Sequence, residues 1–141
     1  MQEPVLTAAE VGAYLDEVFP QVRDGSSVIE SVGPMVARMR LPYSDRNLRP
    51  GGTLSGPSMM ALADYAMYAV ILAHIGKVAL AVTTNLNINF LRKPGPADIF
   101  AEARLLKLGK RLAVGEVTIL QDGLDGPVAH VTSTYSIPPR T

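Results

Sequence analysis

The sequence predicts an α+β fold, in which a curved antiparallel sheet wraps around one long buried helix. Three observations indicate this class. Residues 57–75 are apolar on almost every side of a helix, four strand-like segments follow them, and two more precede them. A helix that is apolar all round has to be covered, and successive strands joined by tight turns form an antiparallel sheet. We expect the sheet to cover most of this helix and a second subunit to cover the remainder.

The chain begins with a short amphipathic helix. Thr7 and Glu10 have the spacing of a capping box, in which each side chain bonds the other residue's backbone. Apolar residues then recur at helical spacing, so we expect a helix over residues 7–19. Pro20 ends it, because the residue before a proline is disfavoured in helical geometry.

Two strands and a loop follow. Residues 27–32 and 35–41 are strand-like and flank a turn at Gly33 and Pro34. The second strand has one core face, formed by Met35, Ala37, Met39 and Leu41. Residues 42–53 are rich in Gly, Pro, Asn and Asp, which predicts a loop.

The long helix has clear boundaries and is followed only by strands. Pro57 suits a first helical position, where a backbone N–H would be unpaired anyway, and Gly76 suits the C-terminal stop. In the first strand after it, one face has Val82, Thr84, Leu86, Ile88 and Phe90, and the other has Thr83, Asn85, Asn87 and Asn89. The inner faces of the other three are Ile99, Ala101, Ala103 and Leu105; Ala113, Gly115, Val117 and Ile119; and Ala129, Val131, Ser133, Tyr135 and Ile137.

Composition narrows the class of protein. The 141 residues suit a single domain over residues 1–141, with residues 1–20 as a helical segment packed on it. Apolar residues make up 48% and charged residues 18%, with zero formal net charge, so the chain lacks the clustered positive charge that a nucleic-acid partner requires. There is no cysteine. The N-terminus lacks a signal-peptide pattern, and the stretch 59–75 is too short and polar for a membrane span. We expect a cytoplasmic protein without a membrane partner.

Asp64 is the first candidate functional residue. It is the only acid between Leu54 and Gly76, and no Lys or Arg lies in that stretch to pair with it. An unpaired carboxylate in apolar surroundings costs several kcal/mol unless it is hydrogen-bonded, solvated in a cleft or protonated. Such acids cluster at functional sites. The structural alternative is that Asp64 bonds a backbone group or a neighbouring subunit and only positions the helix.

The loop before the long helix is the second candidate. A glycine-containing loop that leads into a helix N-terminus presents backbone N–H groups to developing negative charge, and Gly56 could donate in this way. An ordinary loop and cap would have the same sequence. Ser55 does not indicate a Ser/His/Asp triad, because the G-x-S-x-G elbow is absent. His74 and His130 are isolated and lack an acidic cluster at ligand spacing, so we predict no metal site.

Three further groups have two interpretations each. Lys107, Lys110 and Arg111 surround a turn and either hold a phosphate or are solvated. Met59, Met60, Met67 and Tyr68 either line an acyl pocket or pack the helix. The asparagines between residues 85 and 89 form either a subunit-pairing face or an exposed one.

Residues 45–137 resemble the hotdog-fold thioesterases of the phenylacetate-degradation type. That family has an Asn, then His-Gly-Gly, then an Asp inside the long helix, and residues 48–64 are similar to this stretch. Asp64 falls at the position of the family's catalytic acid. Gly56 matches the first glycine, whose N–H polarises the thioester carbonyl.

The later part of the chain also resembles this family. Thr83 falls where some members have a serine that helps to orient the attacking water. Residues 85–94 look like the family's following strand and turn, and residues 106–113 look like the later turn near which members bind coenzyme A phosphates. We therefore expect Lys107, Lys110, Arg111 and Arg49 to contact the coenzyme A part of a substrate.

Three positions depart from the family pattern. Ser55 stands in place of the histidine, Arg49 stands in place of the asparagine, with Asn47 two residues earlier, and Pro57 stands in place of the second glycine. The departures leave a non-catalytic acyl-CoA or lipid-like ligand binder as an alternative function. A purely structural oligomer, with Asp64 bonded across subunits, is a further alternative. Hydration of an enoyl thioester is disfavoured because no Asp/His dyad is visible.

The resemblance implies hydrolysis of acyl-coenzyme A thioesters. Asp64 would act as general base on water or attack the carbonyl as a nucleophile. The N–H of Gly56 would stabilise the oxyanion, Ser55 would donate a hydroxyl, and Thr83 would orient the water. No cofactor is implied beyond coenzyme A as part of the substrate. The resemblance also implies a homodimer with a shared sheet, or a homotetramer of two such dimers, with Asp64 of one subunit facing Gly56 of the other.

Overall fold

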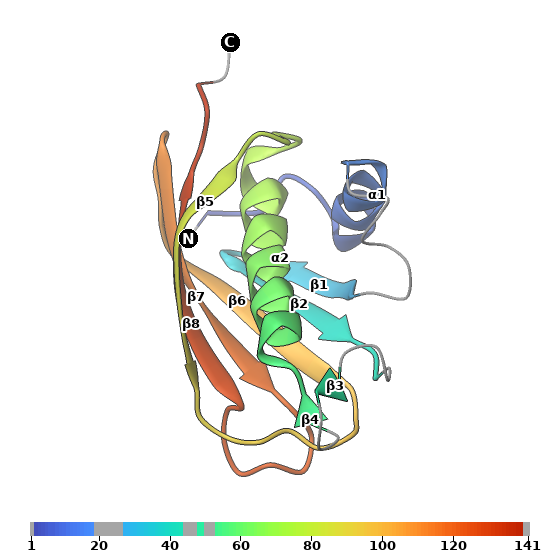
Figure 1. Cartoon of the computed structure of the whole chain (residues 1–141). Helices are drawn as coiled ribbons and strands as arrows, with labels where there is room; N and C mark the ends of the chain where they lie inside the picture. Colours follow the sequence, from blue (N-terminus) through green and yellow to red (C-terminus); the bar gives the residue numbers. More distant parts are fainter. Residues whose placement is uncertain (1, 19–26, 44–47, 50–52, 140–141) are drawn as a thin grey trace.

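The computed structural model describes residues 2–18, 27–43, 48–49 and 53–139. One six-stranded sheet has the order β1-β2-β6-β7-β8-β5, and every neighbouring pair of strands is antiparallel. The long helix α2 crosses one face of this sheet, and the short helix α1 lies beside it at the β1 side (Figure 1). This arrangement confirms the predicted α+β class with an antiparallel sheet around a central helix.

The order of elements matches the predicted order. The helices are α1 (Ala8–Val18) and α2 (Gly56–Ile75). The strands of the large sheet are β1 (Val28–Gly33), β2 (Val36–Leu41), β5 (Val82–Phe90), β6 (Ile99–Leu108), β7 (Leu112–Leu120) and β8 (Ala129–Ser136). The predicted loop also contains a small hairpin that the sequence pattern missed, formed by β3 (Leu48–Arg49) and β4 (Thr53–Leu54).

Local sequence signals set the ends of α2. Ser55 is the N-cap, and its hydroxyl oxygen accepts a hydrogen bond from the Ser58 backbone N–H at 3.2 Å. Pro57 lies in the first turn, as predicted. Gly76 ends the helix with a φ of 93°, a left-handed value that glycine adopts without steric cost.

The core lies between α2 and the inner face of the sheet. Most of α2 from Met59 to His74 is buried. The predicted inner residues of β2, β6, β7 and β8 are buried as well, with the exception of Met35, which lies in the turn before β2 and is half-buried. This burial confirms the alternation within those four strands. By length and composition α2 could cross a membrane, but 67% of its most apolar window is buried inside the protein. We assign it as the core helix of a soluble fold; the cytoplasmic compartment stays a prediction.

The predicted faces of β5 are wrong at the start of the strand. Thr83 pairs with Tyr135, whereas Asn85 pairs with Thr134, so Thr84 is an extra residue in a β-bulge. A bulge changes which side of the sheet the residues before it face, relative to those after it. Thr83 therefore faces α2 together with the later residues Leu86 and Ile88, while Val82 and Phe90 are exposed.

The N-terminal segment attaches to the C-terminal half of α2. The Thr7–Glu10 capping box is present, because the Thr7 N–H donates to Glu10 Oε1 at 2.9 Å and the Glu10 N–H donates to Thr7 Oγ1 at 3.1 Å. The backbone N–H groups of Val5 and Leu6 both donate to the carbonyl oxygen of Ala73. The single-domain organisation over residues 1–141 stays a prediction.

Candidate active site

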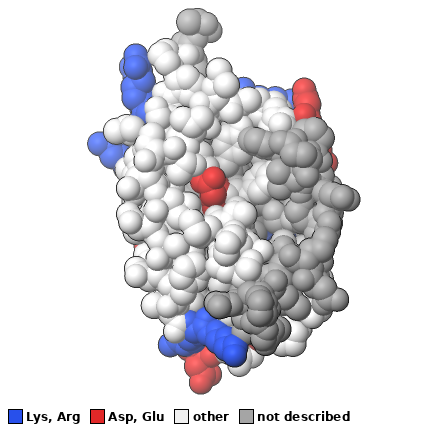
Figure 2. Space-filling view, viewed as in Figure 1, with Lys and Arg blue, Asp and Glu red and all other residues white. Residues whose placement is uncertain are grey.

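One stripe of α2 is left uncovered by the sheet. Its members follow helical spacing, and each is exposed or half-buried, unlike most of the helix. They are Pro57, Met60, Ala61, Asp64 and Tyr65. The stripe lies beside β5, the edge strand of the sheet. Figure 2 shows that this face is almost free of charged groups, with one acidic group near its centre.

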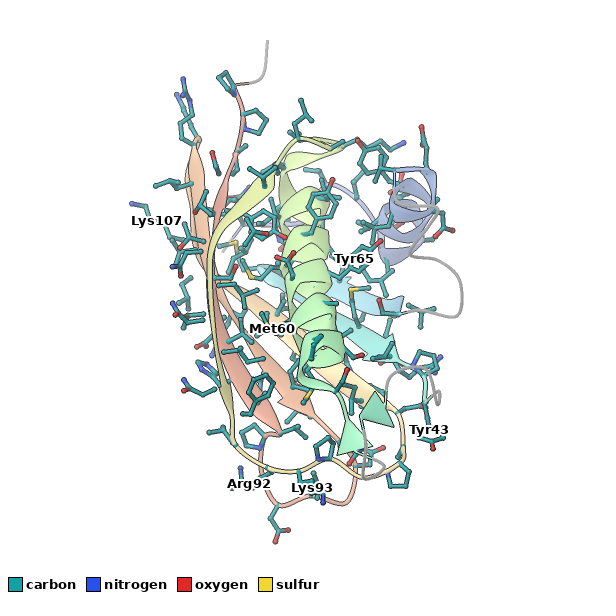
Figure 3. All side chains as sticks on the ribbon, viewed as in Figure 1. Tyr43, Met60, Tyr65, Arg92, Lys93 and Lys107 are labelled. Atoms are coloured by element: carbon teal, nitrogen blue, oxygen red, sulfur yellow. The ribbon has the colours of Figure 1, made fainter. Side chains whose placement is uncertain are left out.

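A pocket of about 350 Å³ opens between α2 and the beginning of β5. Its wall contains one charged residue, one threonine, three tyrosines and three small or branched apolar residues. They are Asp64, Thr83, Tyr65, Tyr68, Tyr135, Ala61, Ala81 and Val82. Tyr65 and Met60 project from the side of α2 that the sheet does not cover (Figure 3). The pocket is therefore an apolar, aromatic chamber with a single carboxylate.

The Asp64 carboxylate is held by two hydroxyl groups. Thr83 donates its Oγ1 hydroxyl to Asp64 Oδ1 at 2.6 Å, and Tyr135 donates its phenol hydroxyl to the same oxygen at 2.8 Å. The Tyr135 hydroxyl also lies 3.0 Å from the backbone carbonyl oxygen of Asp64. The bulge at Thr84 makes the first contact possible, because it points Thr83 toward α2.

The tyrosines of the pocket are neutral hydrogen-bond donors. Burial, followed by the nearby Asp64 carboxylate, raises the pKa of the Tyr135 hydroxyl. Burial also raises the pKa of Tyr68 to about 12. The Tyr68 hydroxyl donates to the carbonyl oxygen of Ala79 at 3.0 Å, and its ring stacks on that of Tyr135 with centroids 6.2 Å apart. Both phenols therefore keep their protons at any physiological pH.

The second oxygen of the Asp64 carboxylate is available for chemistry. Within the described part of the chain, no side chain or backbone group hydrogen-bonds Oδ2, and no Lys or Arg lines the pocket. A carboxylate with one anchored and one available oxygen can accept a proton from water or attack an electrophilic carbon.

Gly56 lies too far from Asp64 to act on the same atom within one chain. Gly56 begins α2 and Asp64 lies about two turns later, which separates them by roughly 12 Å along the helix axis. As the first helical residue, Gly56 has no intrahelical acceptor for its N–H. The tip of the Phe90 ring lies 3.3 Å from where a Gly56 Cβ would stand. Within one chain, then, the structure does not bring these two predicted residues together.

Ser55 is engaged in capping rather than in the pocket. Its hydroxyl accepts the Ser58 N–H and donates to the Ser58 hydroxyl at 2.8 Å. The structure therefore shows a capping role for the Ser55 hydroxyl, and its role as a hydroxyl donor to substrate stays a prediction.

Comparison with known proteins decides the family. A model of the thioesterase superfamily matches residues 51–127, which is more than half of the chain. The chain belongs to the thioesterase superfamily. An archaeal relative from Saccharolobus solfataricus, provisionally named an esterase, is 31% identical over 139 residues, which cover 95% of this chain and 87% of the relative. Membership makes the chain a hydrolase whose general reaction is the hydrolysis of thioesters.

Solved structures of the superfamily confirm the hotdog fold. A crystal structure of a provisionally named thioesterase from a Silicibacter species is 51% identical, with a TM-score of 0.90, and the match covers 98% of this chain and 96% of that one. A variant of the phenylacetic acid degradation protein of Thermus thermophilus is 22% identical, with a TM-score of 0.74 over 84% of this chain and 99% of that one. The second likeness concerns the fold alone.

Three of the four basic residues predicted to contact coenzyme A lie at or beside the β6–β7 turn, and none of the three lines the pocket. Lys107 is at the end of β6 and projects away from α2 (Figure 3), and Lys110 and Arg111 are exposed in the turn. A row of paired residues runs from this turn to the pocket: Leu112 pairs with Ser136, which pairs with Val82. Arg49 lies in β3, where its backbone pairs with Thr53.

The sequence interpretation named Tyr68 as a possible pocket residue but missed Tyr65 and Tyr135. Tyr135 was placed on the inner face of its strand, but its hydroxyl was not connected with Asp64. A signal existed, because a buried tyrosine hydroxyl needs a partner and Asp64 is the only charged group on the helix opposite. Of the ambiguous group, Tyr68 lines the pocket, Met59 and Met67 belong to the core, and Met60 is on the uncovered stripe.

Both histidines have structural partners. His74 is buried at the end of α2, where its Nε2 accepts the Met35 N–H at 2.8 Å and its Nδ1 lies 2.8 Å from the Val70 carbonyl oxygen. His74 therefore connects the backbone before β2 with the last turns of α2. His130 contacts Glu116 on the outer face of the sheet at 3.1 Å. Among the described residues, no cluster of three His, Asp or Glu side chains could hold a metal ion.

Proposed function

We propose that this protein hydrolyses acyl-coenzyme A thioesters, with the Asp64 carboxylate as the group that activates or delivers the attacking oxygen. The observation that supports this most directly is the isolated carboxylate in a tyrosine-lined pocket, with Oδ1 held by two hydroxyls and Oδ2 available. An acid that served only to position the helix would need neither an available oxygen nor a chamber of about 350 Å³ beside it.

Two routes fit this arrangement. In the first, Oδ2 takes a proton from water while the water oxygen bonds to the thioester carbonyl carbon. The tetrahedral intermediate then expels the thiolate, which takes the proton back from Asp64. In the second, Oδ2 bonds to the carbonyl carbon and the thiolate leaves, after which water cleaves the mixed anhydride and restores Asp64. Both routes yield one carboxylic acid and one thiol.

The oxyanion donor in this proposal comes from a second copy of the chain. Because roughly 12 Å of helix separates Gly56 from Asp64, the Gly56 N–H of one subunit would serve the Asp64 of the other. The uncovered stripe of α2 and the free edge of β5 lie side by side, and together they offer an apolar surface and an unpaired strand to a second copy. We therefore propose a homodimer formed through β5, with two identical composite sites.

The row from the pocket to the β6–β7 turn suggests where the coenzyme A part lies. Val82 lines the pocket and is exposed, and exposed Leu112 lies two strands away, at about 10 Å for ordinary strand spacing. Lys110 and Arg111 come directly before Leu112. A thioester whose acyl group enters the pocket could run its pantetheine arm along this row and place its phosphates at the basic turn.

A non-catalytic acyl-CoA binder is the second candidate. The observation that favours it is Ser55, which stands at the family's histidine position and whose hydroxyl is engaged in capping α2. A binder would use the same pocket and the same basic turn, but it would release no thiol.

A thiol-release assay separates the two candidates. Short, long and aromatic acyl-CoAs are screened with the unaltered protein, and binding of each is measured by calorimetry with a non-hydrolysable thioether analogue. Release above the uncatalysed rate for at least one thioester supports hydrolysis. Binding of the analogue without any release supports the binder, and neither binding nor release rejects both. Light scattering in the same buffer tests the dimer, which a monomeric mass would contradict.

A further inference from the structure

The sequence-based prediction did not connect Tyr135 with Asp64, although Tyr135 donates the second hydrogen bond to the Asp64 carboxylate. Tyr135 lies on β8, and its hydroxyl reaches both the side chain and the main chain of the same residue, at 2.8 Å from Oδ1 and 3.0 Å from the carbonyl oxygen. The Tyr135 side chain is almost fully buried, at 3% exposure, and its ring stacks on Tyr68. Its position is therefore fixed by packing and independent of any ligand.

This contact restricts how the carboxylate can turn. A tyrosine hydroxyl has one proton, which it divides between a charged oxygen and a neutral carbonyl oxygen at nearly equal distances. The bond to the charged oxygen is the stronger one. Because the same hydroxyl also touches the main chain of Asp64, it ties Oδ1 to the helix backbone. Rotation that would exchange Oδ1 and Oδ2 breaks the contacts of Tyr135 and Thr83 together.

We propose that Tyr135 is a positioning residue that assigns the two carboxylate oxygens different roles, with Oδ1 as the anchored oxygen and Oδ2 as the reacting one. This inference rests on the proposed role of Asp64 in hydrolysis. Thr83 on the edge strand β5 and Tyr135 on the neighbouring strand β8 both hydrogen-bond Oδ1, so both favour Oδ1 as the anchored oxygen. Two donors on one oxygen leave the negative charge and the free lone pairs of the other oxygen directed to the pocket.

The competing explanation is that Tyr135 only satisfies its own buried hydroxyl. A phenol in the core needs an acceptor, and the carbonyl oxygen of Asp64 at 3.0 Å would suffice for that purpose. Under this explanation the loss of the hydroxyl affects folding stability and not the chemical step. The two explanations therefore differ in which kinetic quantity changes.

The deciding variant is Tyr135→Phe, which removes the hydroxyl and keeps the stacked ring. We expect kcat to fall about 10- to 100-fold, the range of one hydrogen bond to a charged group, while KM changes by less than about twofold. Tyr43→Phe, which removes a hydroxyl from an exposed residue after β2 that does not line the pocket (Figure 3), is the matched control and should leave both constants unchanged.

A second pair of variants tests the shared oxygen. Thr83→Val should lower kcat in the same way, and Thr83→Ser, which keeps the hydroxyl, should restore it. Because both hydroxyls hold Oδ1, the loss in the Tyr135→Phe/Thr83→Val double variant should be smaller than the product of the two single losses.

Three outcomes would overturn the inference. They are a Tyr135→Phe variant with normal kcat, a change confined to KM, and a fall in activity that only follows the loss of folded protein in a thermal melt. Asp64→Asn is measured alongside. If that variant is inactive and Tyr135→Phe is normal, only the positioning role fails. If Asp64→Asn is fully active, the proposed function itself fails.

Discussion

Carboxylates on the outer face of the sheet have different partners from the Asp64 carboxylate at the seam between α2 and β5. On the outer face, away from α2, acids are paired with cations: Glu30 contacts Arg38 at 3.1 Å and Arg40 at 3.2 Å, and Glu116 contacts Arg104 at 3.0 Å. At the seam between α2 and β5, Asp64 contacts hydroxyl groups and no cation among the described residues. The side chains of Glu30 and Arg38 are each 33% exposed, and Asp64 is half-buried as well, so the partners of these acids, and not their burial, make the difference.

This difference in partners distinguishes acids that serve the structure from an acid whose charge is available for chemistry. Exposed ion pairs contribute little to stability, and a guanidinium that occupies a carboxylate also blocks its reactivity. Hydroxyl donors orient a carboxylate without neutralising it, so its charge remains available in surroundings where electrostatic effects are strong. The outer face is therefore expected to tolerate substitution, and the seam is not. The predictions below test this contrast, in order of expected effect.

The largest effect is expected from Asp64→Asn. The amide has the shape of the carboxylate but cannot accept a proton from water or attack a carbonyl, so kcat for thioester hydrolysis should fall by about 100- to 10,000-fold. The matched control on the outer face is Glu102→Gln, which loses an ion pair with Arg38 and should keep its turnover. Steady-state thiol release measures both. Equal effects of the two substitutions would contradict the contrast between the faces.

The second-largest effect is expected from loss of the Gly56 N–H, the proposed oxyanion donor from the second subunit. Gly56→Pro removes the N–H at a helix position that tolerates proline, and the extended backbone of Ser55 before it is compatible with the change. We expect kcat to fall about 100- to 1,000-fold. Gly56→Ala is the control, because it places the same Cβ near Phe90 but keeps the N–H.

Co-expression tests whether this site is composite. A mixed dimer of Gly56→Pro and Asp64→Asn subunits contains one intact site, so a statistical mixture should recover about a quarter of the normal rate. Activity no higher than that of the separate variants would indicate that both groups act within one chain.

A smaller effect is expected at the basic turn. Lys110→Ala and Arg111→Ala should raise KM for acyl-CoA several-fold at low salt, and less at high salt, because exposed charges are screened. A truncated thioester of N-acetylcysteamine, which has no phosphates, should show no change. Arg104→Ala removes a cation of the outer face and serves as the control. A rise in KM for both kinds of substrate would place the effect on the acyl pocket instead.

The smallest effect is expected at the N-terminal cap. Thr7→Ala removes the hydroxyl that accepts the Glu10 N–H and should lower the free energy of unfolding by about 1 kcal/mol. The hydrogen bonds from Thr7 lower the pKa of Glu10. The Glu10 carboxylate therefore contributes to the free energy of unfolding above its unfolded-state pKa. This contribution is lost as the pH falls through the folded-state pKa. Urea titrations should show a smaller difference in the free energy of unfolding between Thr7→Ala and the unaltered protein at acidic pH than at neutral pH. Turnover at neutral pH, measured by thiol release, should be unchanged.

Much of the fold could be predicted because its determinants are local. Thr7 and Glu10 fix the start of α1, Pro57 and Gly76 mark the two ends of α2, and period-two alternation identifies the inner residues of β2, β6, β7 and β8. Asp64 was also predictable, since a single charge in a long apolar helix is visible without any structure.

Only the tertiary structure decided how the site is assembled. The bulge at Thr84 leaves no mark on the alternation, yet it turns Thr83 toward Asp64. Tyr135 is 71 residues from Asp64 in sequence, and its contact depends on β8 being the strand beside β5. The sequence by itself determined the elements of the large sheet, both helices and the candidate acid Asp64, because propensity and periodicity are properties of neighbouring residues. Which oxygen of that acid is held, and by which hydroxyls, depends on strand register and packing between distant segments, which no local pattern encodes.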